Sequence, residues 1–267
     1  MTRNDDPQAL GAAEQLAAIE RGAERLAATL DLSPPGTPVV TCGEWDLAKL
    51  VRHTGLTHRW AAAIVAERLT DPPDTTAIDL GFPDRDAGAG PWAEWMRQGA
   101  RRLVELFSAT PQDTPVWSWG RDQRVAFWSR RMAHETTMHA ADAALALGQQ
   151  PEISMALALD GLDELLANLA RGRAFAARHE KFPRSGTVHL HATDDHLPEG
   201  TGEWMIEFRP DGYTWAHGHG KGDAAVKGPA VALELLAYGR MSPDDHRVQV
   251  FGDADALGCW LANSQLA

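Results

Sequence analysis

The chain has 267 residues, a hydrophobic fraction of 44% and a formal net charge of -12. This length allows two domains, and the acidic balance disfavours binding to nucleic acid or to anionic membranes. No run approaches the roughly 18 consecutive apolar residues of a membrane span, and the polar, acidic N-terminus lacks the layout of a signal peptide. A cytoplasmic location is therefore expected.

The first part of the chain is predicted to be all-α. Apolar residues recur at helical spacing over 8–30, 44–69, 91–110, 124–147 and 154–177. Stretches rich in proline and glycine interrupt this pattern at 31–43 and 70–90. Pro91 suits the first turn of the third helix, and Gly148 suits the end of the fourth.

The last ~85 residues, about the size of a small domain, have a different texture. Residues 187–194 alternate apolar and polar side chains, which predicts a half-buried strand. Residues 202–218 predict a hairpin with its turn at Asp211-Gly212 and three core-facing side chains, Trp204, Ile206 and Phe208. A helix, a short strand and a closing helix are expected at 228–239, 247–253 and 253–263. The predicted division is therefore an all-α domain over 1–178 and an α+β domain over 179–267.

The stretch 130–142 carries the most informative chemistry. It resembles the zinc-protease motif His-Glu-x-x-His, but Met138 stands where the second histidine would be. His134 and His139 diverge by about 140° around a helix and cannot easily share a metal. Glu135 and His139 are four residues apart and share one face, and they offer Zn2+ a carboxylate and an imidazole. Asp142 is placed to orient that imidazole.

A catalytic zinc site needs a third protein ligand, which should come from another helix. His53 is the best candidate, because it lies mid-helix beside Leu50 and Val51, where an unpaired imidazole is costly to bury. His58 faces elsewhere, as a reserve ligand or a surface residue. The alternative remains open at this point: Glu135 and His139 also fit an ordinary helix-surface pair, and His53 fits a satisfied core histidine.

Other histidines, carboxylates and thiols have weaker patterns. His189 and His191 share one face of a strand, and His217 and His219 lie among glycines; we interpret them as exposed polar and loop positions rather than metal ligands. The carboxylates of the fifth helix are interpreted as surface residues: Asp160, Asp163 and Glu164. The cysteines are interpreted as buried structural thiols: Cys42 and Cys259.

Several segments, spread along the chain in order, resemble the mycothiol-dependent maleylpyruvate isomerase family. They are TCGEWDLAKLVRHTGLTHRWAA, FWSRRMAHETTMHAADAALALG, ALDGLDELL, GTVHLHATD, KGPAVALELLAYGR and VFGDADALGCWL. The resemblance implies an N-terminal DinB-like four-helix bundle and a C-terminal domain similar to sterol carrier protein 2. It places the family's metal ligands on His53, Glu135 and His139, and an active-site arginine on Arg240. One departure is Cys42-Gly43-Glu44-Trp45, where the family often has Cys-Pro-Gly-Trp.

The resemblance implies a metalloenzyme that uses mycothiol, the small thiol of actinomycetes, as its thiol cofactor. Its metal would be Zn2+, although a His2Glu set accepts other divalent ions. The expected partners are this thiol and a small anionic substrate, with neither nucleic acid nor membrane. The expected reaction is a maleylpyruvate-type isomerisation or a thiol S-transfer. A zinc-dependent hydrolase on the same scaffold and a non-catalytic metal-binding regulatory module are the alternatives.

Overall fold

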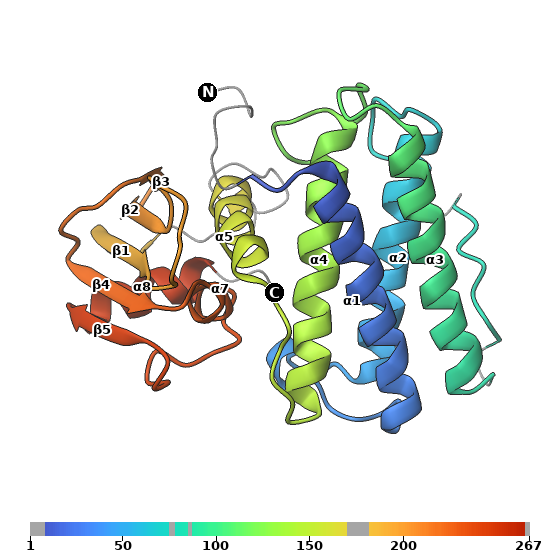
Figure 1. Ribbon diagram of the computed structural model, residues 1–267, viewed down its shortest axis with the longest axis horizontal. Helices are drawn as coiled ribbons and strands as arrows, with labels where there is room; N and C mark the ends of the chain where they lie inside the picture. The colour runs from blue at the N-terminus through green and yellow to red at the C-terminus, as the bar shows by residue number, and fades with distance from the viewer. Residues whose placement is uncertain (1–8, 75–77, 85–86, 170–181, 265–267) are drawn as a thin grey trace. The chain divides into compact units, whose positions relative to one another are not determined.

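The computed structural model describes residues 9–74, 78–84, 87–169 and 182–264. Its contacts divide the chain into two compact units (Figure 1). The N-terminal unit is Gly11–Glu152, and the C-terminal unit is Ile153–Ala267 together with Met1–Leu10. Within the described part of the chain, none of the helices combines the length and the apolar character that a membrane crossing needs.

The N-terminal unit is a bundle of four long helices. These are α1 (Ala12–Leu32), α2 (Leu47–Ala66), α3 (Ala89–Ala109) and α4 (Val125–Ala146), with a short turn of 3-10 helix, η2 (Val40–Cys42), before α2. Helix α1 packs against α3 and α4, and α2 packs against the same two helices. The four helices predicted for this region are confirmed. Helix α3 begins slightly earlier than expected, so Pro91 lies in its first turn, where its missing N–H costs no helical hydrogen bond.

Small residues allow the helices of the bundle to approach one another closely. A Cβ atom on Gly55 would lie 2.1 Å from the Trp95 ring, and one on Gly22 would lie 2.9 Å from the Thr136 side chain. Helix α2 is therefore fixed against α3, and α1 against α4. Asp46 caps α2, since its side chain accepts a hydrogen bond from the Lys49 backbone at 2.8 Å.

The C-terminal unit is an α+β domain with one five-stranded sheet. Its strands are β1 (Gly186–Ala192), β2 (Glu203–Arg209), β3 (Gly212–His217), β4 (Ala224–Gly228) and β5 (Gln249–Gly252), in the order β3-β2-β1-β4-β5. Strands β1 and β4 run parallel, and the other neighbouring pairs are antiparallel. Helices α7 (Ala230–Ala237) and α8 (Ala254–Ser264) pack on β1 and β4. The predicted hairpin is confirmed, and Trp204, Ile206 and Phe208 are fully buried.

One strand of this unit differs from the sequence-based predictions. Strand β4 was not predicted, because its five residues, AAVKG, show no clear alternation of apolar and polar side chains. Helix α5 (Met155–Leu169) packs against α7 and so belongs to the C-terminal unit. The predicted boundary between 178 and 179 lies outside the described residues and stays a prediction. The end of the helix predicted over 154–177 falls on residues 170–177, which lie outside the described residues.

The carboxylates of α5 are buried, so their interpretation as surface residues was wrong. Asp160 is fully buried and Asp163 and Glu164 nearly so. Trp204 Nε1 donates a hydrogen bond to Asp163 at 2.5 Å, and the Leu10 backbone donates one to Asp160 at 3.3 Å. These donors replace water, which is the condition for burying a carboxylate.

Candidate metal centre

Helices α2 and α4 bring His53, Glu135 and His139 together. His53 Nε2 lies 3.0 Å from Glu135 Oε1, and His139 Nε2 lies 3.3 Å from the same oxygen. The two imidazole rings meet edge to face, with centroids 5.1 Å apart. One candidate ligand atom from each residue lies within 4.8 Å of the others. The spacing of four between Glu135 and His139 therefore places both on one face of α4, opposite His53.

A second contact between the same helices fixes their register. His58 is fully buried, and its Nε2 atom lies 2.7 Å from Thr136 Oγ1. The surface alternative for His58 is thus wrong, and this histidine lies outside the ligand group. His134 is also buried and outside the ligand group, in line with its predicted divergence from His139.

Asp142 holds the imidazole of His139 from behind. His139 Nδ1 lies 2.9 Å from Asp142 Oδ2, and Asp142 is fully buried. Thr41 Oγ1 donates to the other oxygen of Asp142 at 2.6 Å, and the Cys42 thiol donates to Oδ2 at 3.2 Å. A proton on Nδ1 that is held by a carboxylate leaves Nε2 as the ligand atom. This matches the orienting role predicted for Asp142.

Glu135 and His139 form a half-buried ion pair. Burial would raise the pKa of Glu135, but the charge of His139 and the hydrogen bonds from His139 and His53 hold that pKa well below its usual value. Burial would lower the pKa of His139, but the Glu135 charge and the hydrogen bond to Asp142 raise it well above its usual value. Arg131 Nη2, which is buried, lies 3.5 Å from Glu135 Oε2. Glu135 is therefore a carboxylate, the form that binds a cation.

The cluster is most accessible on the side of His53. The side chain of His53 is 38% exposed, compared with 21% for Glu135 and 12% for His139. The Trp45 ring lies beside both histidines, with centroid distances of 4.8 Å to His53 and 6.0 Å to His139. Lys49 Nζ lies 5.0 Å from the Trp45 ring centre. A small molecule would therefore approach beside His53, Trp45 and Lys49.

The donor atoms of this cluster fit a divalent metal ion. Two imidazole nitrogens and one carboxylate oxygen form the His2Glu set of catalytic zinc sites, which leave one coordination position open. The supporting carboxylate, Asp142, is the usual partner of a metal-binding histidine. In the protein alone, Glu135 is surrounded by imidazole and guanidinium groups, so a cation could replace the proton between Glu135 and His139.

Comparisons with known proteins identify the family. The family model described as "Mycothiol maleylpyruvate isomerase N-terminal domain" matches residues 16–144, and the model of the C-terminal domain of the same family matches residues 156–258. The chain therefore belongs to the mycothiol-dependent maleylpyruvate isomerase family. The cluster of His53, Glu135 and His139 lies inside the first match, and Arg240 lies inside the second.

Solved structures share the fold. The crystal structure of the mycothiol-dependent maleylpyruvate isomerase is similar with a TM-score of 0.59 and 13% identity, over 92% of this chain and 94% of that one. The structure of a histidine-to-alanine mutant of that enzyme gives a TM-score of 0.57 with the same identity and coverage. No curated protein matches the chain.

Arg240 lies in the C-terminal unit, just after α7. Its Nη1 atom donates a hydrogen bond to the Tyr238 carbonyl at 2.7 Å, and its guanidinium carbon lies 5.9 Å from the Tyr238 ring centre. The side chain is half-buried. The local structure thus holds Arg240 against Tyr238, and its role at the metal centre stays a prediction.

Sequence patterns missed part of the surroundings of the cluster. Cys42 is half-buried beside Asp142 and His139, and Cys259 is also half-buried, so the interpretation as buried structural thiols was wrong for both. Thr41 and Trp45 were not singled out, because they lie in the irregular segment before α2, where no periodicity reports on side-chain direction. Their signals were their position just before the helix that carries His53 and their place in the segment that resembles the family.

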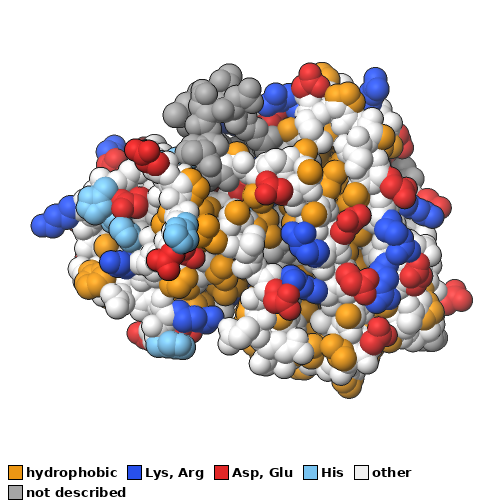
Figure 2. Space-filling model, viewed as in Figure 1, with side chains coloured by type: hydrophobic (Ala, Val, Ile, Leu, Met, Phe, Trp, Pro, Cys, Tyr) orange, Lys and Arg blue, Asp and Glu red, His pale blue; other side chains and the backbone are white. Residues whose placement is uncertain are grey.

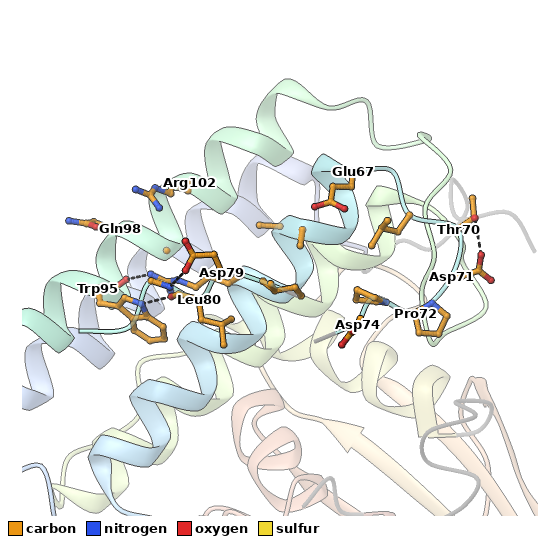
Figure 3. Close-up of a pocket in the computed structure, with 18 residues that line it drawn as sticks. Glu67, Thr70, Asp71, Pro72, Asp74, Asp79, Leu80, Trp95, Gln98 and Arg102 are labelled. Atoms are coloured by element: carbon orange, nitrogen blue, oxygen red, sulfur yellow. Dashed lines mark hydrogen bonds between the residues drawn. The ribbon is translucent and has the colours of Figure 1, made fainter. Parts of the chain in front are cut away.

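A separate cavity of about 760 Å³ lies elsewhere in the N-terminal unit (Figure 3). Its lining includes Glu67, Asp79 and Arg102 but none of the three clustered residues. Arg59, which also lines it, donates to the backbone oxygens of Gly55 and Trp95 and stacks 3.7 Å above the Trp95 ring. Its guanidinium therefore holds α2 against α3, and the cavity is distinct from the candidate metal centre.

Proposed function

We propose that this chain is a mycothiol-dependent isomerase with a divalent metal ion, Zn2+ in the first instance, held by His53, Glu135 and His139. The observation that carries this proposal is the convergence of two imidazoles and a carboxylate from α2 and α4 on a partly open site. Membership of a family named for mycothiol and maleylpyruvate adds the thiol and the substrate class. A divalent ion held by these residues would lower the pKa of a thiol bound to it, so that the thiolate would be available near neutral pH.

The residues around the ligands would each contribute to this chemistry. Asp142 keeps the proton of His139 on Nδ1, so that Nε2 faces the site. Arg131 lies 3.5 Å from the second oxygen of Glu135, and its charge adds to that of His139 in lowering the pKa of this carboxylate. Trp45 would shield the site beside His53, and Lys49 next to it offers a cation for a carboxylate group of the thiol or the substrate.

The reaction would be a reversible addition to an alkene. Mycothiol bound at the site would supply a thiolate that adds to the alkene carbon β to a carbonyl, while the electron pair of the double bond would shift towards the carbonyl oxygen. The former double bond would then be single and free to rotate. Return of the electron pair would break the carbon–sulfur bond and give the trans alkene, fumarylpyruvate from maleylpyruvate. The thiol is regenerated, and neither an oxidant nor water is consumed.

Several finer assignments belong to the same proposal. They are the relation of the bundle to DinB-like proteins, the relation of the C-terminal unit to sterol carrier protein 2, a cytoplasmic location, and a substrate-binding role for Arg240.

A guanidinium can hold a substrate carboxylate through two parallel hydrogen bonds. An Arg240→Lys variant keeps the charge but loses this fork, so we expect KM for the substrate to rise more than kcat falls.

The decisive experiment measures conversion of maleylpyruvate by the metal-loaded full chain, with and without mycothiol. We expect turnover only when both metal and mycothiol are present, and Glu135→Gln should lose turnover together with the metal equivalent held by His53, Glu135 and His139. The matched control is Glu105→Gln, the same change at an exposed position of α3, which should leave both unchanged. Turnover in Glu135→Gln at the wild-type rate would overturn the proposal.

The same assay separates the alternatives. An S-transferase would consume mycothiol in proportion to product and accept other electrophiles. A hydrolase would work without any thiol, through an activated water molecule. A regulatory module would bind metal in elemental analysis and show no turnover with any of these substrates. Each of these outcomes contradicts the isomerase and keeps the metal centre, whereas full metal content in Glu135→Gln would contradict the metal centre itself.

A further inference from the structure

A second group of histidines surrounds one carboxylate in the C-terminal unit. Glu203 Oε1 lies 2.9 Å from His191 Nδ1, and Glu203 Oε2 lies 2.9 Å from His219 Nδ1 and 3.3 Å from His189 Nε2. The centroids of the three imidazole rings are 5.2 to 6.4 Å apart. One ligand atom from each of the four residues lies within 4.8 Å of the others. We call these four residues the sheet cluster.

The register of the sheet explains how the first three members meet. His189 and His191 alternate with core residues of β1, so they project from the face opposite the buried Val188 and Leu190. Glu203 is paired directly with His191 across β1 and β2. Cross-strand partners on the same face lie within contact distance, so these side chains converge without a bend in either strand.

The segment between β3 and β4 supplies the fourth member. After His217, which lies apart from the group and 3.3 Å from Asp163, the chain turns at Gly218 with φ of +137°. It then crosses back over the outer face of the sheet, where Gly222 approaches the His189 backbone so closely that a Cβ atom would lie 3.0 Å from its nitrogen. Positive φ and close approach both favour glycine. This segment therefore places the His219 side chain beside Glu203.

Both ends of this crossing segment are anchored. The Gly218 backbone donates to the Glu203 carbonyl at 3.1 Å. Asp223 accepts hydrogen bonds from the backbone and the hydroxyl of Thr187 at 2.8 and 2.9 Å. His219 is therefore held over the sheet by its neighbours, although its own side chain is 78% exposed. The cluster is preorganised for a ligand that reaches it from solvent.

His189 points to the kind of ligand. This residue is only 5% exposed, and its Nε2 atom has no hydrogen-bond partner among the described residues, although it faces Glu203 at 3.3 Å. A buried ring nitrogen without a hydrogen bond is costly. Four donors around a tetrahedral Zn2+ lie roughly 3.3–3.6 Å apart; here the histidine nitrogens lie 2.9 to 3.3 Å from the Glu203 oxygens, and one ligand atom from each residue lies within 4.8 Å of the others.

We propose that the sheet cluster of His189, His191, Glu203 and His219 binds one divalent transition-metal ion. Three imidazoles and one carboxylate suit Zn2+, Ni2+ or Co2+ and disfavour Ca2+ and Mg2+, which prefer oxygen ligands. Four protein ligands fill a tetrahedral shell, so the role is structural. The ion would fasten the segment between β3 and β4 to β1 and β2, on the face opposite α7 and α8. On the face drawn in Figure 2, exposed histidine side chains gather over this unit beside acidic ones.

The test distinguishes the sheet cluster from the group of His53, Glu135 and His139, which we call the helix-borne cluster. The full chain carrying His53→Ala and His139→Ala lacks the ligands of the helix-borne cluster, so any tightly bound Zn2+ reports on the sheet cluster. After treatment with a chelator and dialysis against Zn2+, we expect elemental analysis to find one equivalent in this variant. With Co2+, we expect the strong visible absorption of four-coordinate cobalt. Addition of His191→Asn and His219→Asn should remove both signals.

Controls keep the result interpretable. His246→Asn replaces a histidine that is 91% exposed and outside the cluster, and it should change neither signal. His219→Asn alone cannot disturb the core, because its side chain is mostly exposed, and it should weaken Zn2+ binding at least tenfold. If the folded His53→Ala/His139→Ala variant binds no Zn2+ or Co2+, the cluster is a hydrogen-bond network around Glu203 and this proposal is overturned. That result would not affect the proposal for the helix-borne cluster, which is tested through Glu135→Gln.

Discussion

The two histidine–carboxylate clusters are built in opposite ways. In the N-terminal unit, Glu135 and His139 follow helical spacing, and one histidine from α2 completes the group. In the C-terminal unit, His189 and His191 follow the alternation of a strand, and Glu203 and His219 come from the neighbouring strand and a crossing segment. The first has three candidate ligands and an open side. The second has four, which fill a tetrahedral shell.

This difference separates a site for chemistry from a site for structure. The helix-borne cluster has a buried support in Asp142 and Arg131, which fixes the protonation of its ligands, while its open side leaves room for a thiol. The sheet cluster has no carboxylate behind its histidines among the described contacts other than Glu203 itself. Its rigidity comes from the backbone anchors of the crossing segment. The geometry of the helix-borne cluster should therefore depend on helix packing, and the geometry of the sheet cluster should depend on the conformation of the crossing segment.

The largest expected effect comes from helix packing. In Gly55→Ala, the new Cβ atom would lie 2.1 Å from the rigid Trp95 ring, so α2 must move away from α3. We expect the N-terminal unit to lose about 3 kcal/mol of unfolding free energy, and His53 to move with α2 and weaken Zn2+ binding. Urea unfolding and elemental analysis measure the two effects. Zn2+ binding by the sheet cluster should not change.

Gly90→Ala is the matched control, because Gly90 lies in α3 and a Cβ atom there meets nothing within 4 Å. This change should stabilise the unit by about 0.5–1 kcal/mol, the usual gain for alanine over glycine in a helix. Equal stability of the two variants would show that the close approach of α2 and α3 does not position His53.

The local parts of both clusters could be predicted from sequence, whereas their partners could not. The spacing of Glu135 and His139, and the shared face of His189 and His191, follow from the geometry of a single helix or strand. His53 opposite Glu135 depends on the register of two helices, and periodicity carries no information on it. The mid-helix position of His53 made it the best candidate, and the family resemblance then placed the third ligand on it. Glu203 joins the sheet cluster through strand register, and His219 joins it through a glycine-rich crossing segment. Neither can be read from the pattern of a single strand, so the histidines were interpreted as exposed polar and loop positions instead of ligands.

The fold shows the same limit. Strong helical periodicity predicted α1 to α4, and alternation predicted β1 and the hairpin of β2 and β3. Strand β4 was not predicted, because AAVKG is short and shows no clear alternation of apolar and polar side chains. The carboxylates of α5 were misplaced because their charge favours the surface, while donors from Trp204 and Leu10, far apart in sequence, make their burial possible.

A smaller effect is expected from the support behind His139. Asp142→Asn keeps the shape of the side chain but removes the charge that holds the proton on His139 Nδ1. Loss of such a partner typically weakens metal binding by about 10–100-fold. Competition with a fluorescent zinc chelator would measure this in the His191→Asn/His219→Asn background. Asp113→Asn, at an exposed position between α3 and α4, is the control. Unchanged affinity in Asp142→Asn would mean that the helix-borne cluster, like the sheet cluster, needs no carboxylate behind its ligands.

The smallest effect concerns acid stability, where the helical unit should respond through His58. Burial lowers the pKa of His58 from 6.5 to about 3, with the nearby Arg59 charge adding to the shift. Below pH ~6.5 the unfolded chain therefore binds a proton that the folded chain excludes, and stability falls as the pH falls. Between pH ~6.5 and pH ~5 this single group should cost about 2 kcal/mol, at about 1.4 kcal/mol per pH unit.

His58→Gln removes this titration, so its urea-unfolding free energy should depend less on pH than that of the wild type by about 2 kcal/mol over the same interval. Measurements in the presence of a chelator exclude proton competition at the metal ligands. His246→Gln, the same change at a side chain that is 91% exposed, should leave the wild-type profile intact. Identical pH profiles for His58→Gln and the wild type would show that His58 is not held neutral between α2 and α4. A different contact between α2 and α4 would then set the register of these two helices.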